Sequence, residues 1–557
     1  MNSTTRRPAG TFSTTEPRRL ARLYLTAAGV WFVLGGIEAL ALRLQLARPG
    51  SHVLGADLYH QLLTMHATTM VFLALLPCAM AMFLAVVPAA IGSDRTAFPR
   101  LGAFALWLHI SGGVLLNLGW CFGGSSTAGG FGYPSLTAIT YAARNEFELL
   151  NDLIRVNGVD FWATGLGLIT LSCAAAALDA LMTVLLRRRA GLRLAALPPF
   201  AWTTLVTSAL ALIAFPLMLA ALTMLQFDRL TGTHFFLPES GVDPARWGRL
   251  FALYGHPQVY LLMLPAMGIV SEVLAAHAGR RLHGGGVIAA SVLLIGVAGA
   301  AAWLGPLLPA VGGGVAWNGV LAPGGWLAAL SATAIVFSWL AGLWGGRIEL
   351  RAAMLFALGF VALFVLGGLS GALGALMPAD GGPVGTSFGV GHLHYMLVGG
   401  SLMGFFAGTY HWFPKFTGRA LDERLGRVHF GLAFVGVHAS FLPMLLLGLA
   451  GMPRQVYTYG PDLGLAGMNL VATLGSFLFA LATLVFLVNV IRSTRGGRPS
   501  PAVPDESPQA PGSHGPLLAA LGVALLASGS LFGWFMGVAG AMLLGIGTWR
   551  TAADARV

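Results

Sequence analysis

The strongest constraint on the fold of this chain is a series of apolar segments, each long enough to cross a lipid bilayer. A membrane-spanning helix needs about 20 mostly apolar residues, and it satisfies its own backbone hydrogen bonds. We therefore expect an all-α polytopic membrane protein with a twelve-helix core. The predicted spans are residues 23–45, 62–90, 101–122, 161–186, 200–227, 250–276, 286–308, 325–345, 352–377, 387–413, 429–450 and 466–491.

Charge sets the expected orientation of these spans. Only 10% of the 557 residues are charged, and the net charge of +11 comes from basic clusters in alternate loops. Cytoplasmic loops carry an excess of Lys and Arg. This pattern predicts an integral protein of a bacterial-type cytoplasmic membrane with both termini in the cytoplasm. It also accounts for the positive charge without nucleic-acid binding.

Four regions follow one another along the chain. We expect a cytoplasmic tail at residues 1–20, the twelve-helix core at 21–495, and a flexible linker rich in Pro, Gly and Ser at 496–516. Residues 517–549 form an apolar run that is too long for one untilted span. A transmembrane hairpin is predicted there, for about fourteen spans in all, with a single tilted helix as the alternative.

Four histidines are predicted to lie at one depth, in the outer third of the membrane: His66, His256, His392 and His394. A polar ring in hydrocarbon is costly, so such residues are expected to have a function. His392 and His394 point about 200° apart on a helix and must serve different partners. The convergence favours a metal or haem site over histidines bonded only to backbone, Ser or Thr of neighbouring helices.

Two imidazoles from different helices on one iron form a low-spin, electron-transferring haem. His66, with small residues beside it, suits this role together with one histidine of the tenth span, and the other would hold a second haem on the opposite flank. His256 and Tyr260 share a helix face and could deliver a proton or an electron to a bound small molecule. The alternative for that segment is a proline-kinked helix with an interfacial tyrosine.

Several stretches make this sequence similar to subunit I of cytochrome c oxidase, the catalytic subunit of the haem-copper oxidases. The resemblance extends from about Leu20 to Arg495. The stretches that carry it are Gln61–Met70, Asp160–Trp162, Asp228–Phe236, Gly255–Tyr260, Val336–Ala341, Gly391–Leu397, His411–Arg419, Glu423–Arg427 and Gly451–Arg454.

The resemblance implies two haems, whose type the sequence does not specify. It implies that His66 and His394 are the axial ligands of a low-spin haem and that His392 is the proximal ligand of a high-spin haem. Arg43 resembles the arginine that contacts the low-spin haem, and Arg454 resembles the first of two arginines on the haem propionates. The expected partners are other oxidase subunits resembling subunits II and III, cytochrome c or quinol as electron donor, membrane lipid, and O2 or another diatomic ligand.

Copper binding is where the sequence departs from this family. His256 matches the first of three copper-binding histidines, and Tyr260 matches the tyrosine cross-linked to it. The other two ligands are an adjacent histidine pair, but Leu307 and Leu308 stand at or near those positions. One imidazole should hold copper far more weakly than three. His256 is therefore at most a residual copper ligand, and no copper site formed by this chain alone is expected.

Residues of proton delivery and magnesium binding also differ from the family. Gln258 replaces a proton-relaying glutamate, and an amide cannot titrate. Val384 and Gly385 replace a magnesium-binding His-Asp pair, so magnesium is not expected. Arg95 stands near the aspartate that opens a proton path, although Asp94 is adjacent. The family's usual proton-pumping chemistry is therefore not expected from these residues.

We expect a respiratory oxidoreductase subunit, similar to cytochrome c oxidase, that passes electrons from the low-spin to the high-spin haem. There a diatomic would be reduced, and the resemblance implies O2. The alternative is a non-catalytic dihaem subunit that transfers electrons or senses a gas, which the missing copper ligands favour. Tyr260 favours the enzyme, since an electron carrier has no need of a phenol beside an open haem.

Overall fold

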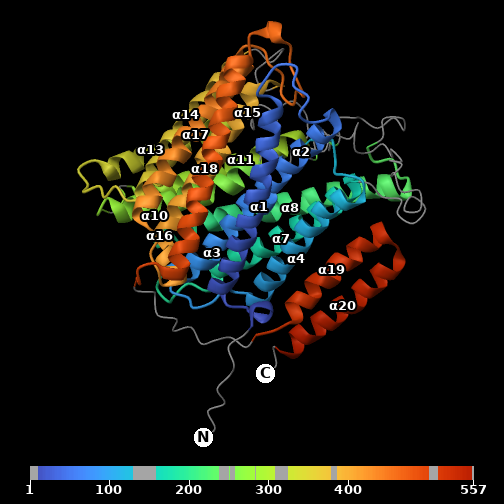
Figure 1. Cartoon of the computed structure of the whole chain (residues 1–557). Coiled ribbons are helices and arrows are strands. Elements are labelled where there is room, and N and C mark those ends of the chain that lie inside the picture. Colours follow the sequence, from blue (N-terminus) through green and yellow to red (C-terminus); the bar gives the residue numbers. More distant parts are fainter. Residues whose placement is uncertain are drawn as a thin grey trace.

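The computed structural model describes residues 10–129, 158–236, 247, 250, 257–280, 282, 284–307, 324–377, 385–500 and 512–554. Over these residues the chain is helical, and its β-pairing is limited to two isolated bridges. Long helices run side by side in one bundle (Figure 1). The all-α polytopic fold predicted from the apolar segments is confirmed.

Each of the twelve predicted core spans overlaps, over its described residues, with a helix or with a rod of consecutive helices. Two rods contain a π-helical stretch between α-helices, and short 3-10 turns lie at η1 (Thr11–Ser13), η3 (Gly119–Phe122), η4 (Leu194–Ala196) and η9 (Pro461–Leu463). The helices are α1 (Pro17–Gln45); α2 (Ala56–Thr68), η2 (Thr69–Leu75) and α3 (Leu76–Ala90); α4 (Pro99–Leu118); α7 (Gly158–Leu186); α8 (Pro199–Thr231); α10 (Pro257–His277); α11 (Gly285–Leu307); α13 (Gly324–Leu343); α14 (Ala352–Leu376); α15 (Ser387–His394), η8 (Tyr395–Leu402) and α16 (Met403–Thr417); α17 (Glu423–Leu449); and α18 (Ala466–Gly496).

Eleven helices in the described part of the chain are long and apolar enough to cross a membrane. They include most of the core and α19 (Gly515–Phe532), whereas the described apolar part of the seventh span, residues 285–301, is shorter. The predicted total of about fourteen spans therefore remains a prediction.

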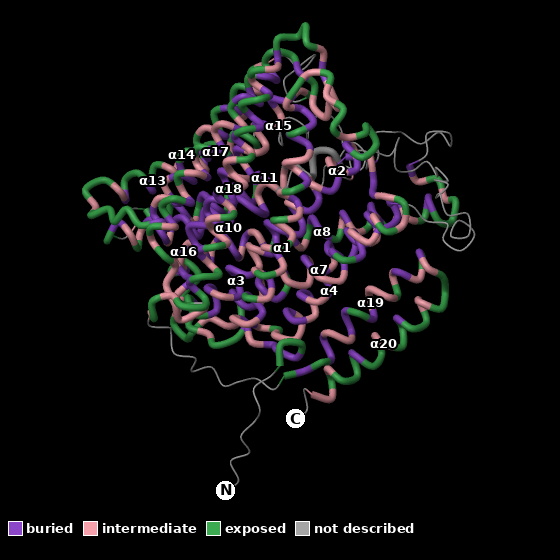
Figure 2. The backbone as a smooth tube through the Cα atoms, viewed as in Figure 1, coloured by how far each residue is buried: buried purple, intermediate pink, exposed green. Residues whose placement is uncertain are grey.

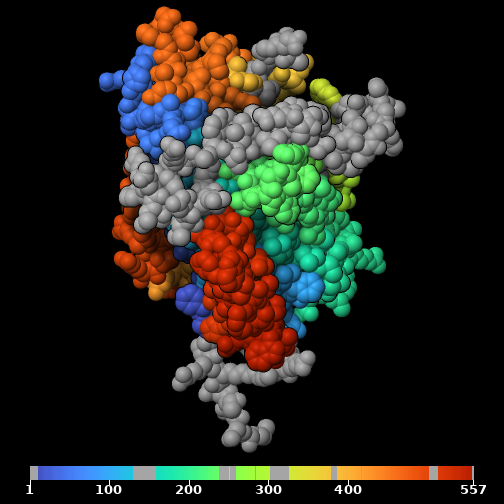
Figure 3. All heavy atoms as spheres, turned by 90° about the vertical axis from the view of Figure 1, so that its right-hand side faces the viewer, coloured from blue at the N-terminus to red at the C-terminus, as the bar shows by residue number. Residues whose placement is uncertain are grey.

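The C-terminal segment forms the predicted hairpin rather than one tilted helix. Helix α19 ends at Phe532, the next residue Gly533 adopts φ +102°, and α20 (Trp534–Ala553) returns alongside α19. Glycines allow this contact, since a Cβ on Gly522 or Gly540 would run into the backbone of the opposite helix. Helix α19 packs against α4, and the hairpin lies on the outside of the bundle (Figure 3).

The ends of the hairpin are fastened to the N-terminal part of the chain. The Ser513 amide donates to the Ser13 carbonyl at 2.8 Å, and the Ser513 hydroxyl donates to Asp554 Oδ2 at 2.6 Å. Arg100, at the start of α4, donates to the Asp554 carbonyl at 2.6 Å. The beginning of α1, the beginning of α4 and both ends of the hairpin therefore lie at the same end of the bundle.

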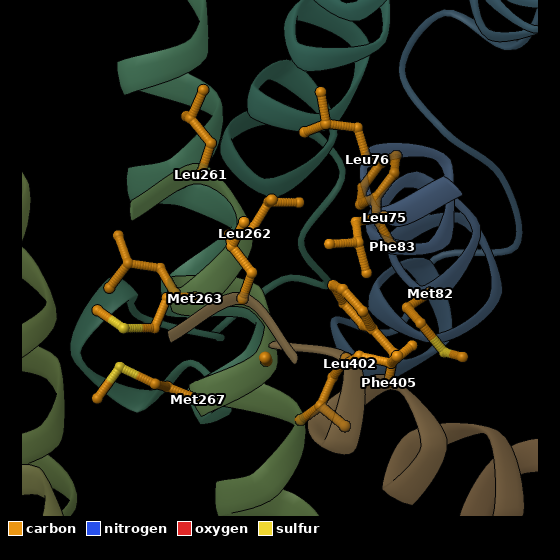
Figure 4. Packing of buried hydrophobic residues seen from close by; sticks show 14 of the residues in the cluster. Leu75, Leu76, Met82, Phe83, Leu261, Leu262, Met263, Met267, Leu402 and Phe405 are labelled. Atoms are coloured by element: carbon orange, nitrogen blue, oxygen red, sulfur yellow. The ribbon is translucent and has the colours of Figure 1, made fainter. Parts of the chain in front are cut away.

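The buried core lies between the helices, while exposed residues face outward (Figure 2). Leucine, methionine and phenylalanine side chains of α3, α10 and α16 meet at its centre, as Leu76, Met82, Leu262, Met267 and Phe405 show (Figure 4). This packing positions α10 and the rod formed by α15, η8 and α16 beside each other.

A buried ion pair joins the beginning of α7 to the end of α8. Arg229 donates through Nε to Asp160 Oδ1 at 2.6 Å and through a second nitrogen to Oδ2 at 3.1 Å, and each side chain is 3% exposed. Two parallel bonds of this kind fix orientation as well as distance. They hold the end of α8 against the beginning of α7.

Arg229→Ala should destabilise the protein by about 3–5 kcal/mol, because the Asp160 carboxylate stays buried after losing its arginine. The free energy of unfolding in detergent measures this effect. Arg351→Ala is the matched control, since Arg351 pairs with Glu349 at 3.1 Å with side chains 64% and 61% exposed. Its expected cost is about 0–1 kcal/mol. Equal losses in the two variants would contradict the prediction.

Candidate functional site

Three of the predicted ligand histidines line one large cavity. Its volume is about 1940 Å³, and His66, His392 and His394 all contribute to its wall. Pockets for ordinary small ligands measure about 300–1,000 Å³, so this cavity has room for two large ligands. Its remaining wall is mostly apolar, as expected for a site that receives a flat hydrophobic group.

His66 and His394 face one another across this cavity from two separate rods. Their ring planes are parallel within 6°, and their centroids are 6.3 Å apart. A metal held by two Nε2 atoms at about 2 Å from each would place the ring centroids roughly 6 Å apart. The two rings therefore have the spacing of a pair that shares one metal ion.

Backbone carbonyls select the tautomer of both rings. His66 Nδ1 lies 2.8 Å from the Gly35 carbonyl of α1, and His394 Nδ1 lies 2.8 Å from the Val390 carbonyl. A carbonyl only accepts, so each Nδ1 must carry the proton, and each Nε2 keeps a lone pair for a metal. Bonding of these histidines to backbone groups was the alternative to metal binding. That bonding is present, but it involves only Nδ1, so it orients each ring and leaves Nε2 for a metal.

A π-helical stretch follows each of these two histidines. Helix α2 ends two residues after His66 and continues as η2, while η8 begins at the residue after His394. Such stretches are rare and are found mostly at functional sites. Phe441 of α17 packs on the His394 ring with a centroid distance of 4.5 Å.

His392 is oriented by a serine of α14. The Ser370 hydroxyl donates to the Gly367 carbonyl at 2.8 Å, and the same oxygen lies 3.0 Å from His392 Nδ1. A hydroxyl has one proton, so Ser370 accepts from His392 Nδ1–H, and Nε2 is again left with its lone pair. Gly371 keeps space beside this ring, because a Cβ there would lie 2.9 Å from His392 Cε1.

Arg43 supplies a further indication that the cavity receives a polar substituent. Its side chain is 8% exposed and lines the cavity. One terminal nitrogen donates to the Asn469 carbonyl at 2.8 Å, but Nε is buried without a hydrogen-bond partner in the described part of the chain. An unsatisfied donor of this kind fits an acceptor group on a bound ligand. Arg454 also lines the cavity, and its amide donates to the Gly385 carbonyl at 3.1 Å.

The histidines and arginines fit haem, whereas most positions of the family's copper site lie outside the described residues. Tyr260 lines the cavity, but His256 and Leu308 lie outside the described residues, and so does the side chain of Leu307. The described residues contain no group of three or more His, Cys, Asp or Glu placed to hold a metal ion. No reaction step through copper is therefore derived. Val384, which stands in place of one of the family's magnesium-binding residues, also lies outside the described residues.

Ser370 and Gly35 are the functional positions that the sequence predictions missed. Ser370 is the one polar side chain in α14, and that isolation within an apolar helix could have indicated it. Gly35 contributes only a carbonyl, and a Cβ on it would lie 3.2 Å from Thr69 and Met70 of the facing rod. No sequence signal identifies which carbonyl a distant histidine will contact.

Ser370→Ala should weaken the attachment of the ligand at His392, because the ring loses the acceptor that fixes its tautomer. Removal of such an outer partner costs about 10–100-fold in metal affinity or activity. The iron–histidine stretching band in resonance Raman spectra should move to lower frequency, and haem should dissociate faster. Thr409→Ala removes a hydroxyl that donates to the Phe405 carbonyl at 2.7 Å and should leave both measurements unchanged. An unchanged Raman band in Ser370→Ala would refute this role.

This cavity, with two opposed histidines inside an all-α membrane bundle, has the geometry of a site for a haem with two histidine ligands. A haem-copper terminal oxidase dimer solved by cryo-EM has the same fold, with a TM-score of 0.69, 18% identity and 92% of each chain covered. Residues 19–478 match the family described as cytochrome C and quinol oxidase polypeptide I.

Two similar proteins, a cytochrome c oxidase subunit and a quinol oxidase subunit, agree with this family match. Cytochrome c oxidase subunit 1 of Bacillus subtilis (strain 168) is 40% identical over 487 residues, which cover 86% of this chain and 75% of that protein. Quinol oxidase subunit 1 of the same organism is 33% identical over 484 residues, covering 87% and 72%. The chain therefore belongs to the family of subunit I of cytochrome c and quinol oxidases, which are integral membrane oxidoreductases of respiration.

Proposed function

We propose that this chain is the haem-binding subunit of a terminal respiratory oxidase, with one haem on His66 and His394 and a second on His392. The observation that carries the proposal is the state of the three rings, each of which has Nδ1 bonded within the protein and Nε2 left for a metal. When bound, the haems supply electron transfer and an iron position open to a diatomic, of which O2 is the first choice.

The chain's own residues hold these groups and prepare the site. Gly35, Val390 and Ser370 keep the ligand rings in one tautomer and one orientation. Arg43 presents its buried Nε to a polar substituent of the ligand on the His394 side. Tyr260 presents a phenol to the cavity, where it can give a proton and an electron to a bound small molecule. We propose that Arg454 faces the ligand's carboxylates.

The electron donor and the partner subunits are proposed from the family relationship and not from the geometry of this site. Other oxidase subunits are proposed as partners, with cytochrome c or quinol as donor, because both kinds of oxidase occur among the relatives. A non-catalytic dihaem subunit is the second candidate function. The leucines at positions 307 and 308 favour it, whereas Tyr260 in the cavity favours the oxidase.

Spectra of the purified protein test the proposal. Dithionite-reduced minus oxidised spectra should show two haems, and carbon monoxide should change the spectrum of one of them. Metal analysis should find iron without stoichiometric copper, and oxygen uptake with a reduced donor separates the oxidase from the electron carrier. Absence of haem would overturn both candidates. One copper ion per chain would show that a copper site is completed by residues other than the missing pair.

A further inference from the structure

Two histidines outside the haem cavity meet where α10 and α16 pack together. His277 is the last residue of α10, and His411 lies in the last two turns of α16. His277 Nε2 is 3.3 Å from His411 Nδ1, the ring centroids are 5.3 Å apart, and the ring planes cross at 72°. Neither residue is among those that line the large cavity. The proposed haem sites therefore do not account for this pair.

The spacing of the two rings matches that of two imidazoles on one tetrahedral metal ion. Zinc binds a histidine nitrogen at about 2.0–2.1 Å, so two such nitrogens lie roughly 3.3 Å apart and their ring centroids roughly 5.2 Å apart. A straight hydrogen bond between rings with the same separation of nitrogens would place the centroids roughly 5.6 Å apart. The centroid distance of 5.3 Å is closer to the metal-bound arrangement.

The chemistry of the two nitrogens selects the kind of ion. Imidazole suits Zn²⁺, Cu²⁺ and Ni²⁺, whereas Mg²⁺ and Ca²⁺ prefer oxygen ligands. In a hydrogen-bonded pair, one ring donates its N–H to the lone pair of the other. When a metal binds, the donating ring carries its proton on its other nitrogen, and both facing nitrogens then offer a lone pair. Both side chains are half-buried, which leaves them accessible to water for the remaining coordination positions.

Charged side chains of both signs surround the pair. Glu349 and Glu423 place negative charge near His277. Arg351 places positive charge near the same ring, and Lys415 does so near the other. Because these charges oppose one another, metal binding depends on the two ring nitrogens. No group of three or more His, Cys, Asp or Glu placed to hold a metal ion occurs in the described part of the chain, so an ion here would have two protein ligands and would exchange with solution.

We propose that His277 and His411 form a binding site for one divalent transition-metal ion of the zinc type, with water in the remaining positions. The ion joins the end of α10 to α16. Helix α10 carries Tyr260, and α16 continues the rod that carries His392 and His394. Metal binding therefore fastens together two elements of the haem cavity without touching the proposed haem ligands. This inference does not depend on the proposed oxidase function.

Zinc titration of the purified holoprotein in detergent, after free metal has been removed with a chelator, tests the proposal. The parent should bind Zn²⁺ at this site, and excess Mg²⁺ should not displace it. His277→Ala and His411→Ala should each weaken this binding more than about 100-fold, since loss of an outer partner alone costs about 10–100-fold. With one equivalent of Zn²⁺, the zinc K-edge X-ray absorption spectrum of the parent should show two histidine nitrogens.

His52→Ala is the matched control. His52 is exposed, and its Nδ1 lies 3.3 Å from the Tyr457 hydroxyl, so the variant also removes a histidine with one polar contact of the same length. It should keep the zinc affinity of the parent. Haem content shows whether each variant is folded. If an alanine variant loses haem, His277→Gln or His411→Gln takes its place, because a glutamine side chain keeps a polar group there but is a poor ligand for zinc.

Thermal unfolding gives a second measurement of the same site. Zn²⁺ should raise the Tm of the parent and leave the Tm of both histidine variants unchanged, because an ion that binds only the folded state stabilises it. A parent that binds no Zn²⁺ would overturn the proposal, as would parent affinity in His277→Ala and His411→Ala. Neither measurement involves oxygen uptake, so failure of the proposed oxidase function would leave this test unaffected.

Discussion

His392→Ala is expected to reduce the haem content from two groups per chain to one and to abolish the spectral change caused by carbon monoxide. The reason is that alanine has no atom to replace His392 Nε2, the proposed ligand atom, which is left free because Nδ1 is bonded to Ser370. The haem between His66 and His394 should remain, because its two ligands come from other positions. Haem extraction assays and reduced-plus-CO difference spectra measure both effects.

The control for this variant is His438→Ala. His438 lies on α17, accepts from or donates to the Tyr395 hydroxyl at 3.0 Å, and does not line the cavity. It should keep both haems and the response to carbon monoxide. If His392→Ala also kept both haems and the response to carbon monoxide, His392 would not be a haem ligand. The proposal of a second haem on His392 would then have to be abandoned.

His394→Leu is expected to remove the low-spin haem and to lower oxygen uptake by roughly 100-fold or more, since outer partners alone are worth about 10–100-fold. His66→Leu should have the same effect, because a low-spin haem requires both axial rings. Residues that act as a unit are not additive, so the double variant should be no worse than either single variant. The low-spin absorption band and the uptake rate test this.

Phe441→Leu is the control variant for His394→Leu. Its ring packs on His394 at 4.5 Å but offers no ligand atom. We expect the low-spin band to stay, with a small shift. A single His66 or His394 variant that kept an unaltered low-spin band would contradict the shared site, even though the two rings are parallel within 6°.

Much of the fold and the depth of the site could be predicted from the amino-acid sequence. Hydropathy located the core helices, because a segment's preference for lipid depends on its own side chains. Counting along those rods placed His66, His392 and His394 at one level, since the rise per residue of a helix is constant. Their common cavity agrees with that prediction.

Other features depended on contacts between distant segments. The sequence alone left open whether the histidines would be bonded to backbone or would bind a ligand, and the structure shows that their Nδ1 bonds leave Nε2 for a ligand. Ser370 and the Gly35 carbonyl became visible only when α14 and α1 were placed beside the ligand helices.

Substitutions at single positions, such as Gln258, predicted that most of the family's proton-input residues are missing from this chain. A small cavity of about 70 Å³ emerges only from the packing of α1, α3, α4, α7, α8 and α10, because its lining residues belong to different helices. The sequence by itself determined which segments are helices and which residues could bind or titrate. Only the tertiary structure decided which of those residues face a common space, since that depends on how far-apart segments pack.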